Sequence, residues 1–235
     1  MVFNTLYSLC ALIYAVVRVC QRVPAASHIE FPQTANSDDT GILQKGTTLM
    51  RFTASSLLIV LAFTNLLLGE PAEVVIIRHA EKPEEGNELS LAGRERAAAL
   101  SPYLLGNPAV MKFGRPVAIY AQAQKHASSS VRSIQTVQPL ADALHLKINH
   151  AFERDDYKNM VAEINREKKY DGHTVVICWE HKVIPEIAEE FAADDAPQKW
   201  PGDAFDRTWV LTLKSGHRYK CNDLPQKLMF GDSKN

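Results

Sequence analysis

The sequence has few cysteines, almost no net charge and no long apolar run, and each of these absences excludes a class of protein. Only four of its 235 residues are cysteine, without a CxxC pair or a spacing typical of zinc sites. The formal net charge is −1 and no segment is a basic tract, which argues against nucleic-acid binding. No apolar run reaches the ~20 residues of a transmembrane helix. Ordinary globular composition remains, with 46% hydrophobic and 23% charged residues.

The cysteines do not decide the cellular compartment. Cys10 and Cys20 lie near the N-terminus, whereas Cys178 follows apolar residues of a predicted strand and Cys221 lies close to the C-terminus. Buried free thiols are the favoured interpretation of Cys178 and Cys221. A disulfide between these two is the alternative.

The first 70 residues lack the pattern of a folded core. Residues 6–19 are apolar, and residues 21–45 then turn polar, contain two prolines and a glycine, and show no sustained periodicity. We therefore predict that residues 1–49 are a disordered or mis-assigned extension.

A second apolar run, residues 57–68, has the layout of a secretory signal peptide. Met50 and Arg51 provide a start and a positive charge before it, and small or polar residues follow it. We predict a signal peptide over residues 50–70, cleaved near residues 69–72, and a secreted or periplasmic protein. The alternative is an uncleaved anchor that tethers the protein to a membrane.

Short apolar runs alternate with helical patterns from residue 73 onward. The predicted strands cover residues 74–77, 116–121, 146–148 and 174–179, and a closing hairpin covers 209–213 and 218–220. The predicted helices cover residues 89–105, 131–144, 157–168 and 183–193. Such alternation predicts one domain over residues 71–235, a three-layer α/β/α sandwich with a mostly parallel central sheet.

Two residues mark particular positions in these helices. Ser90 is predicted to cap the N-terminus of the first helix, because its hydroxyl can accept a free backbone N–H there. Pro139 lies inside the second helix, where it is expected to kink or divide it.

Ionisable side chains follow the first predicted strand at the point where it ends. Arg78 and His79 come directly after the apolar run, and Glu81 and Lys82 follow. Open α/β sheets bind ligands outside the carboxyl ends of their strands. A guanidinium beside an imidazole suits an anionic oxygen ligand, above all phosphate. Taken alone, however, an Arg-His pair favours a strand that simply ends in a solvated polar turn, so the phosphate hypothesis depends on the rest of the chain.

Two later strand ends carry residues of the same kind. Ser128, Arg132 and Thr136 are spaced four apart around the start of the second helix, where free N–H groups suit phosphate. His181 follows the fourth strand. Because carboxyl ends of parallel strands meet at one edge of a sheet, these groups are predicted to form one anion site.

These motifs resemble those of the histidine phosphatase superfamily, which has the phosphoglycerate-mutase-like fold. The matching elements are R-H at Arg78 and His79, S-x-x-x-R-x-x-x-T from Ser128, and the strand-terminal His181, in the same order and spacing. The resemblance covers residues 73 to the C-terminus. Ala80 replaces the glycine of many members, and Lys182 replaces the aspartate of the acid-phosphatase branch, which disfavours that branch.

The resemblance implies a role for each matching residue. His79 would attack phosphorus and form a phosphohistidine that water hydrolyses. Arg78, Arg132 and His181 would hold the phosphoryl oxygens. Ser128 and Glu81 are further candidates for substrate binding. The leaving oxygen needs a proton, and the candidate donors are Glu153, Asp155, Asp156 and Glu81.

The sequence thus predicts a histidine phosphatase, a phosphoric monoester hydrolase that needs neither metal nor cofactor. Its partner would be a phosphorylated small molecule, a phosphoprotein or phosphohistidine, with a membrane involved only if the apolar segment stays uncleaved. The short intervals between motifs leave little room for a large cap, so an open site is expected. The alternatives are phosphoglycerate-mutase-like phosphoryl transfer and a non-catalytic module that binds a phosphorylated ligand.

Overall fold

The structure of the protein is a computed structural model that describes residues 69–233. The predicted extension and residues 50–68 of the predicted signal peptide lie outside the described residues. Within 69–233, no helix is both long enough and apolar enough to cross a membrane.

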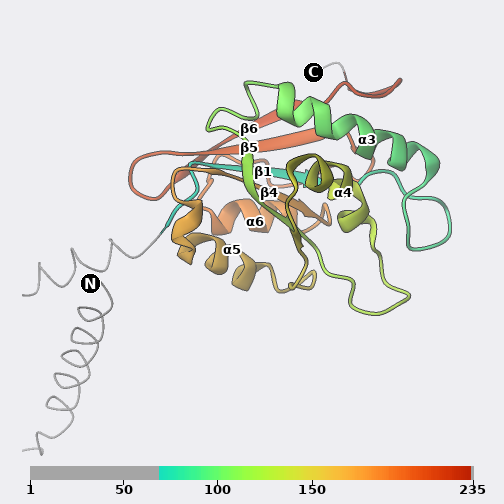
Figure 1. The fold of residues 1–235 in the computed structure, drawn as a ribbon, viewed down its shortest axis with the longest axis horizontal. Helices are drawn as coiled ribbons and strands as arrows, with labels where there is room; N and C mark the ends of the chain where they lie inside the picture. The colour runs from blue at the N-terminus through green and yellow to red at the C-terminus, as the bar shows by residue number, and fades with distance from the viewer. Residues whose placement is uncertain (1–68, 234–235) are drawn as a thin grey trace, which may run out of the picture. The chain divides into compact units, whose positions relative to one another are not determined.

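A single six-stranded sheet forms the middle layer of the described domain (Figure 1). Its strands are β1 (Glu73–Arg78), β2 (Pro116–Ala121), β3 (Ile148–Asn149), β4 (Thr174–Trp179), β5 (Arg207–Leu213) and β6 (Tyr219–Pro225). Their order is β3-β2-β4-β1-β5-β6. The first four are parallel to one another, and the β5–β6 hairpin adds antiparallel to β1. The predicted mostly parallel sheet is confirmed.

The position of β1 explains its composition. It lies between β4 and β5, and its side chains alternate between the two apolar clusters, Val74 and Ile76 in one and Val75 and Ile77 in the other, so both of its faces are covered. All six of its residues are buried, and the run from Val74 to Ile77 is 0% exposed. Branched apolar side chains fill such a two-sided environment, which is why the strand shows a continuous apolar run instead of alternation.

Four α-helices complete the sandwich, two on each face of the sheet (Figure 1). They are α3 (Leu91–Gly106), α4 (Arg132–Leu144), α5 (Tyr157–Arg166) and α6 (Ile184–Glu190). Leu100 and Leu104 of α3 share one apolar cluster with Val137 and Leu140 of α4. The apolar stripes of α5 and α6 share the cluster on the opposite face. The predicted three-layer α/β/α class is therefore confirmed.

The helices differ in detail from the sequence-based expectation; the predicted helix over 183–193, for example, runs only from Ile184 to Glu190. Ser90 caps α3 as predicted, since its hydroxyl accepts the Gly93 N–H at 3.1 Å. Pro139, by contrast, does not divide α4, which runs unbroken from Arg132 to Leu144. The predicted helix over 157–168 ends at Arg166, and a 3₁₀ turn, η2 (Lys168–Tyr170), follows it.

The folded domain begins before β1. The Glu70 carbonyl accepts the Gly172 N–H at 3.1 Å, the Pro71 carbonyl accepts the Tyr219 hydroxyl at 2.6 Å, and the Ala72 carbonyl accepts the Leu213 N–H at 3.0 Å. Residues 70–72 are thus part of the folded domain, and proteolytic cleavage within them would remove these hydrogen bonds.

Cys178 and Cys221 are both buried and both carry free thiols. Cys178 lies in β4 and joins the apolar cluster under α3 and α4, whereas Cys221 lies in β6 and joins the cluster on the other face. The favoured interpretation as free thiols is confirmed, because the sheet separates the two sulfur atoms.

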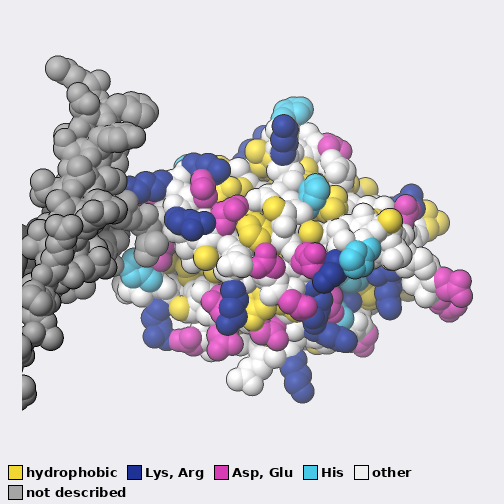
Figure 2. Space-filling model, turned by 90° about the horizontal axis from the view of Figure 1, so that it is seen from below, with side chains coloured by type: hydrophobic (Ala, Val, Ile, Leu, Met, Phe, Trp, Pro, Cys, Tyr) yellow, Lys and Arg dark blue, Asp and Glu magenta, His cyan; other side chains and the backbone are white. Residues whose placement is uncertain are grey.

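Charges of both signs are interspersed on the face shown in Figure 2, without a broad basic area. This distribution agrees with the near-zero net charge of the sequence.

Glu73 is a buried carboxylate at the start of β1, at the end of the sheet away from Arg78. Its Oε1 accepts the Thr174 hydroxyl at 3.2 Å, and its Oε2 has no partner among residues 69–233. Burial raises the pKa of Glu73 from 4.5 to about 7. The native state therefore binds a proton that the unfolded chain has already lost between these two pH values.

Glu73→Gln should accordingly remove a pH dependence of stability. A raised native pKa makes the wild type lose stability as pH rises from about 4.5 through about 7, by roughly 1–3 kcal/mol in all. Urea unfolding at pH 5 and pH 8 should show the variant gaining relative to wild type at the higher pH. The exposed Glu84→Gln is the control. An equal difference in unfolding free energy between Glu73→Gln and wild type at pH 5 and at pH 8 would contradict a raised pKa for Glu73.

Candidate active site

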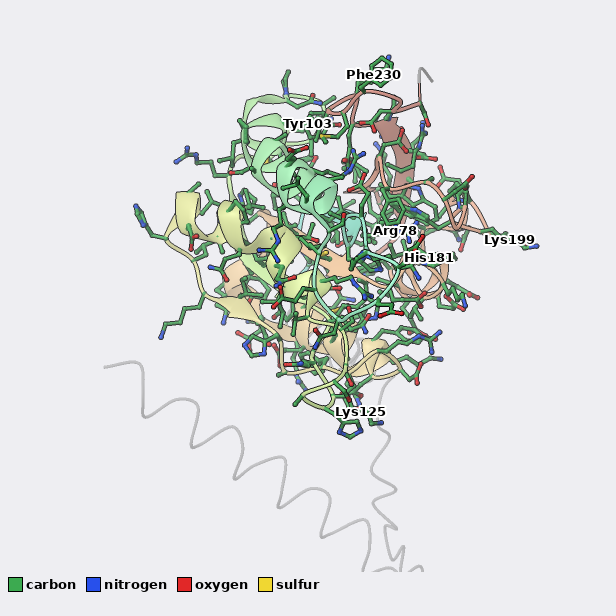
Figure 3. All side chains as sticks on the ribbon, turned by 90° about the vertical axis from the view of Figure 1, so that its right-hand side faces the viewer. Arg78, Tyr103, Lys125, His181, Lys199 and Phe230 are labelled. Carbon is green, nitrogen blue, oxygen red and sulfur yellow. The ribbon has the colours of Figure 1, made fainter. Side chains whose placement is uncertain are left out.

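The register of the parallel strands brings the predicted site residues to one edge of the sheet. Arg78 pairs with Trp179 across β1 and β4, and the His79 N–H donates to the Trp179 carbonyl at 3.3 Å. The residues after Arg78 therefore lie beside those after Trp179, among them His181. Figure 3 shows Arg78 and His181 next to each other at this edge.

The His79 ring has a defined tautomer. Its Nδ1 lies 2.7 Å from the Ala80 carbonyl oxygen. Because a carbonyl oxygen only accepts hydrogen bonds, Nδ1 must carry the proton of the neutral ring and Nε2 must hold the lone pair. The ring is only 8% exposed and lies 6.1 Å from the Phe205 ring, centroid to centroid.

The surroundings of His79 keep the imidazole neutral. Burial lowers its pKa to about 4, and the positive charges of Arg78 and Arg132 act in the same direction against the opposing hydrogen bond to Ala80. A neutral imidazole with a free Nε2 lone pair is the nucleophilic form of histidine.

Arg78 is a buried cation with a fixed position. Its Nη1 donates to the carbonyl oxygens of Gly202 and Ala204, each at 2.9 Å, and its guanidinium lies 3.8 Å from the centroid of the Phe205 ring. Burial lowers the pKa of Arg78 to about 10, which leaves the group charged at neutral pH. Its Nε is buried without a hydrogen-bond partner among residues 69–233, so a donor remains for an anion.

Arg132 and Thr136 connect the start of α4 to the loop after β1. Arg132 donates from Nε to the Glu88 carbonyl at 2.9 Å and from Nη2 to the Gly86 carbonyl. The Thr136 hydroxyl accepts the Ala80 N–H at 2.9 Å and donates to the Arg132 carbonyl at 2.7 Å. Thr136 thereby supports the residue whose own carbonyl orients the His79 ring.

His181 faces a carboxylate from the residue before it. Its Nδ1 lies 3.1 Å from Glu180 Oε1, and the side chains of His181 and Glu180 are 17% and 21% exposed. The pKa of His181 is lowered, because burial and the charge of Arg78 outweigh the opposing effect of Glu180. His79 thus has a carbonyl oxygen as its hydrogen-bond partner, whereas the buried Nδ1 of His181 makes no hydrogen bond among residues 69–233.

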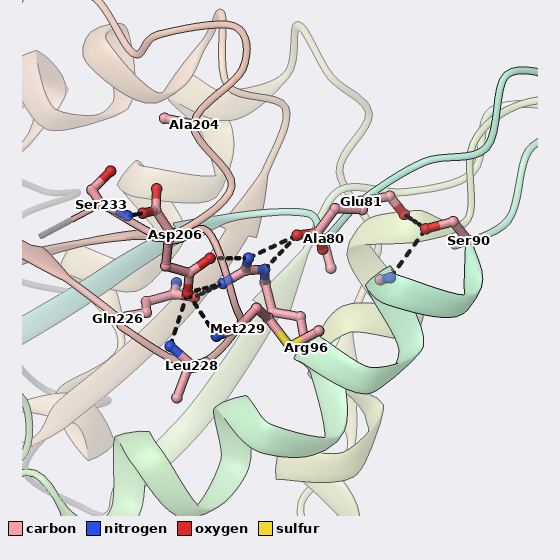
Figure 4. Close-up of polar contacts among 12 residues, drawn as sticks. Ala80, Glu81, Ser90, Arg96, Ala204, Asp206, Gln226, Leu228, Met229 and Ser233 are labelled. Atoms are coloured by element: carbon pink, nitrogen blue, oxygen red, sulfur yellow. Dashed lines mark hydrogen bonds and ion pairs between the residues drawn. The ribbon is translucent and has the colours of Figure 1, made fainter.

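Glu81 places one carboxylate oxygen against a buried arginine, whereas its Oε2 is buried without a hydrogen-bond partner among residues 69–233. Its Oε1 accepts from Arg96 Nε at 2.8 Å, and Arg96 also pairs with Asp232 at 2.6 Å (Figure 4). Arg96 is 4% exposed and joins the loop after β1 to the C-terminal segment. Gly93 makes this packing close, because a Cβ there would lie 2.3 Å from the Glu81 carbonyl oxygen.

The other predicted proton donors and Ser128 lie on exposed loops. Glu153 pairs with Lys125 at 3.0 Å and Asp155 pairs with Arg154 at 2.5 Å, with the Asp155 side chain 82% exposed. Asp156 precedes α5, where its carboxylate accepts from Asn159 at 2.5 Å. Ser128 is exposed in the loop between β2 and α4. Arg78, His79 and His181 thus come together, with Arg132 within electrostatic reach.

Nothing in the sequence indicated the segment between α6 and β5 that contacts the Arg78 side chain. Gly202, Ala204 and Phe205 come from the connection between α6 and β5, more than 120 positions away. Trp200 fixes this segment by donating to the Ala204 carbonyl at 2.8 Å. No charge or motif marks these residues, since they act mainly through backbone oxygens.

No family model and no curated protein sequence matches this chain. Solved structures do show similarity. A protein named as the phosphohistidine phosphatase SixA from Agrobacterium tumefaciens has 18% identity and a TM-score of 0.47, over 66% of this chain and 98% of that one. A protein histidine phosphatase SixA complexed with tungstate has 13% identity and a TM-score of 0.43, over 66% and 97%.

A phosphoglycerate mutase from Bacillus anthracis is similar to the same extent. It has 13% identity and a TM-score of 0.45, over 68% of this chain and 96% of that one. These proteins are members of the histidine phosphatase superfamily, which the motifs of this sequence resemble.

Thr136→Val should destabilise the domain through the loop after β1. The substitution keeps the side-chain shape but leaves the buried Ala80 N–H without an acceptor. Losing that partner should cost about 1–3 kcal/mol of unfolding free energy. Urea unfolding measures the change, and Thr136→Ser, which keeps the hydroxyl, is the control. Equal losses in both variants would show that the methyl contacts matter and the hydroxyl does not.

Proposed function

We propose that this protein is a phosphatase that hydrolyses phosphomonoesters or phosphohistidine through a phosphohistidine intermediate on His79. The observation that carries the proposal is the state of the His79 ring. Its Nδ1 proton is committed to the Ala80 carbonyl, its pKa is lowered to about 4, and cations lie close by. A neutral nucleophile beside positive charge is what attack on a phosphoryl group requires.

Two chemical steps follow from this arrangement. In the first, the His79 Nε2 lone pair forms a bond to phosphorus while the bond from phosphorus to the leaving oxygen breaks, and the leaving oxygen takes up a proton from a carboxylic acid of the site or from water. Arg78, Arg132 and His181 would stabilise the negative charge on the phosphoryl oxygens, as phosphoryl transfer demands. In the second step, a water oxygen bonds to phosphorus, the P–N bond breaks, and inorganic phosphate and the neutral histidine are released.

The substrates that this site favours are small phosphomonoesters and proteins that carry a phosphoryl group on a side chain. Only ten residues separate β2 from α4, and eleven separate β1 from Ser90, the cap of α3, so neither connection carries a large cap over the strand ends. An open site admits a phosphorylated side chain of another protein as well as a small phosphomonoester.

His79→Ala should abolish turnover while the domain still folds. Removing the nucleophile should lower kcat by roughly 10³-fold or more and eliminate an acid-labile phosphoenzyme trapped from the wild type. Hydrolysis of a panel of phosphorylated compounds, with acid-quench labelling, measures both. His173→Ala is a matched control, because that histidine is exposed at the opposite end of β4. Saturable binding of a phosphate ester without any product would instead indicate a binding module.

Arg132→Ala should weaken binding of inorganic phosphate and of vanadate, a mimic of the trigonal-bipyramidal transition state. Losing one charge-assisted donor pair should cost about 10–100-fold in affinity. Arg132→Lys should recover only part of it, since an ammonium lacks the planar fork. Arg94→Ala is the control, because Arg94 contacts the same loop through an exposed pair with Glu88 at 2.8 Å. Unchanged vanadate inhibition in Arg132→Ala would remove Arg132 from the site.

A further inference from the structure

The hydrogen bonds of Arg78 leave one edge of its guanidinium free. A guanidinium carries five N–H donors in one plane. Nη1 donates to the carbonyl oxygens of Gly202 and Ala204, at 2.9 Å each, which uses both of its hydrogens. Nε and Nη2 make no hydrogen bond within residues 69–233. The N–H groups of Nε and Nη2 point the same way, and their spacing matches two oxygens of one phosphoryl group.

Phe205 covers one face of this guanidinium. The Arg78 Cζ lies 3.8 Å from the centroid of the Phe205 ring, well within the distance of a cation–π contact. The two carbonyl groups hold Nη1 from within the plane of the guanidinium, whereas the aromatic face opposes rotation out of that plane. The three contacts together determine which way the free edge points.

The segment that carries these contacts is anchored to the same sheet as Arg78. Trp200 donates from Nε1 to the Ala204 carbonyl at 2.8 Å, and its ring lies 5.1 Å from that of Trp209, centroid to centroid. Trp209 belongs to β5, where it pairs with Ile76 of β1. The segment over residues 200–205 therefore has a fixed position relative to the end of β1.

Core packing does not explain an aromatic residue at position 205. Phe205 belongs to none of the apolar clusters within residues 69–233, and it borders a cavity of about 650 Å³. On its other side it contacts Arg78, and the ring of His79 lies 6.1 Å away. The ring is thus placed for the site and not for the core.

We infer that Phe205 is a positioning residue that fixes the plane of Arg78, so that Nε–H and Nη2–H together bind two oxygens of a phosphoryl group. The inference rests on the proposed function, in which Arg78 holds phosphoryl oxygens, and it adds which edge of the guanidinium does so. Phe205 acts through Arg78 and makes no hydrogen bond to the phosphoryl group.

The first test is the affinity for inorganic phosphate, measured by calorimetry. In Phe205→Leu the guanidinium is free to turn and must be ordered on binding, which should weaken phosphate binding about 2- to 10-fold. Phe205→Tyr keeps the aromatic face and should keep the wild-type affinity. Phe230→Leu is the matched control, because Phe230 is an exposed ring that lines the same cavity.

The second test is the NMR signal of the Arg78 Nε–H group, assigned by its loss in Arg78→Lys. Phosphate should shift this signal in the wild type, because Nε is one of the two proposed donors. In Phe205→Leu the signal should exchange faster with water. A merely structural role of Phe205 would lower the free energy of unfolding without a selective change at this group.

Unchanged phosphate affinity in Phe205→Leu, or an equal loss in Phe205→Tyr, would overturn the inference. An Arg78 Nε–H signal that phosphate leaves unshifted in the wild type would also overturn it, and that measurement needs no variant to fold. Neither test needs turnover. Retained turnover in His79→Ala would therefore refute the phosphohistidine mechanism while leaving the role of Phe205 in phosphate binding to be decided by these two results.

Discussion

The parallel pairing of β1 with β4 is the interaction on which the whole site depends. Residue for residue, Glu73 to Arg78 lies beside Thr174 to Trp179, and the ladder ends at the hydrogen bond from His79 to the Trp179 carbonyl. A slip of one position would turn every side chain of β1 to the other face of the sheet. Because both strands are buried, such a slip is strongly disfavoured, and the two histidine segments stay together.

Backbone carbonyl groups hold the cations of this site in place. Arg78 donates to Gly202 and Ala204, and Arg132 donates to Gly86 and Glu88. Carbonyl oxygens satisfy guanidinium N–H groups without cancelling their charge, as carboxylates would. Both guanidinium groups therefore keep their charge at this edge, where the carboxylates of Glu180, Glu81 and Asp203 also act on Arg78.

A second network ties the loop after β1 to the C-terminal segment. Arg96 joins Glu81 to Asp232, and Asp232 also accepts the backbone N–H groups of Leu228 and Met229. Glu81 is two positions after His79, so this network limits the movement of the nucleophile's own loop. Carboxylates therefore serve in this domain mainly to fix cations and loops.

The sequence by itself determined the layers of the fold and the residues that meet at the sheet edge. The apolar run of β1, the alternation of strands and helices, the Ser90 cap, and the pair Arg78 and His79 all depend on local patterns that the chain displays openly. Such patterns arise because side-chain periodicity reflects which face of an element is buried.

Only the tertiary structure decided how each group is partnered. Nothing local to Glu81 indicates that Arg96, itself paired with Asp232, will engage it, and nothing near Arg78 indicates the carbonyl oxygens of Gly202 and Ala204. The continuity of α4 across Pro139 likewise shows only in the structure. These contacts join residues far apart in the chain through backbone atoms or paired charges, and neither leaves a pattern in the sequence. The protonation states that the chemistry needs are set by those partners.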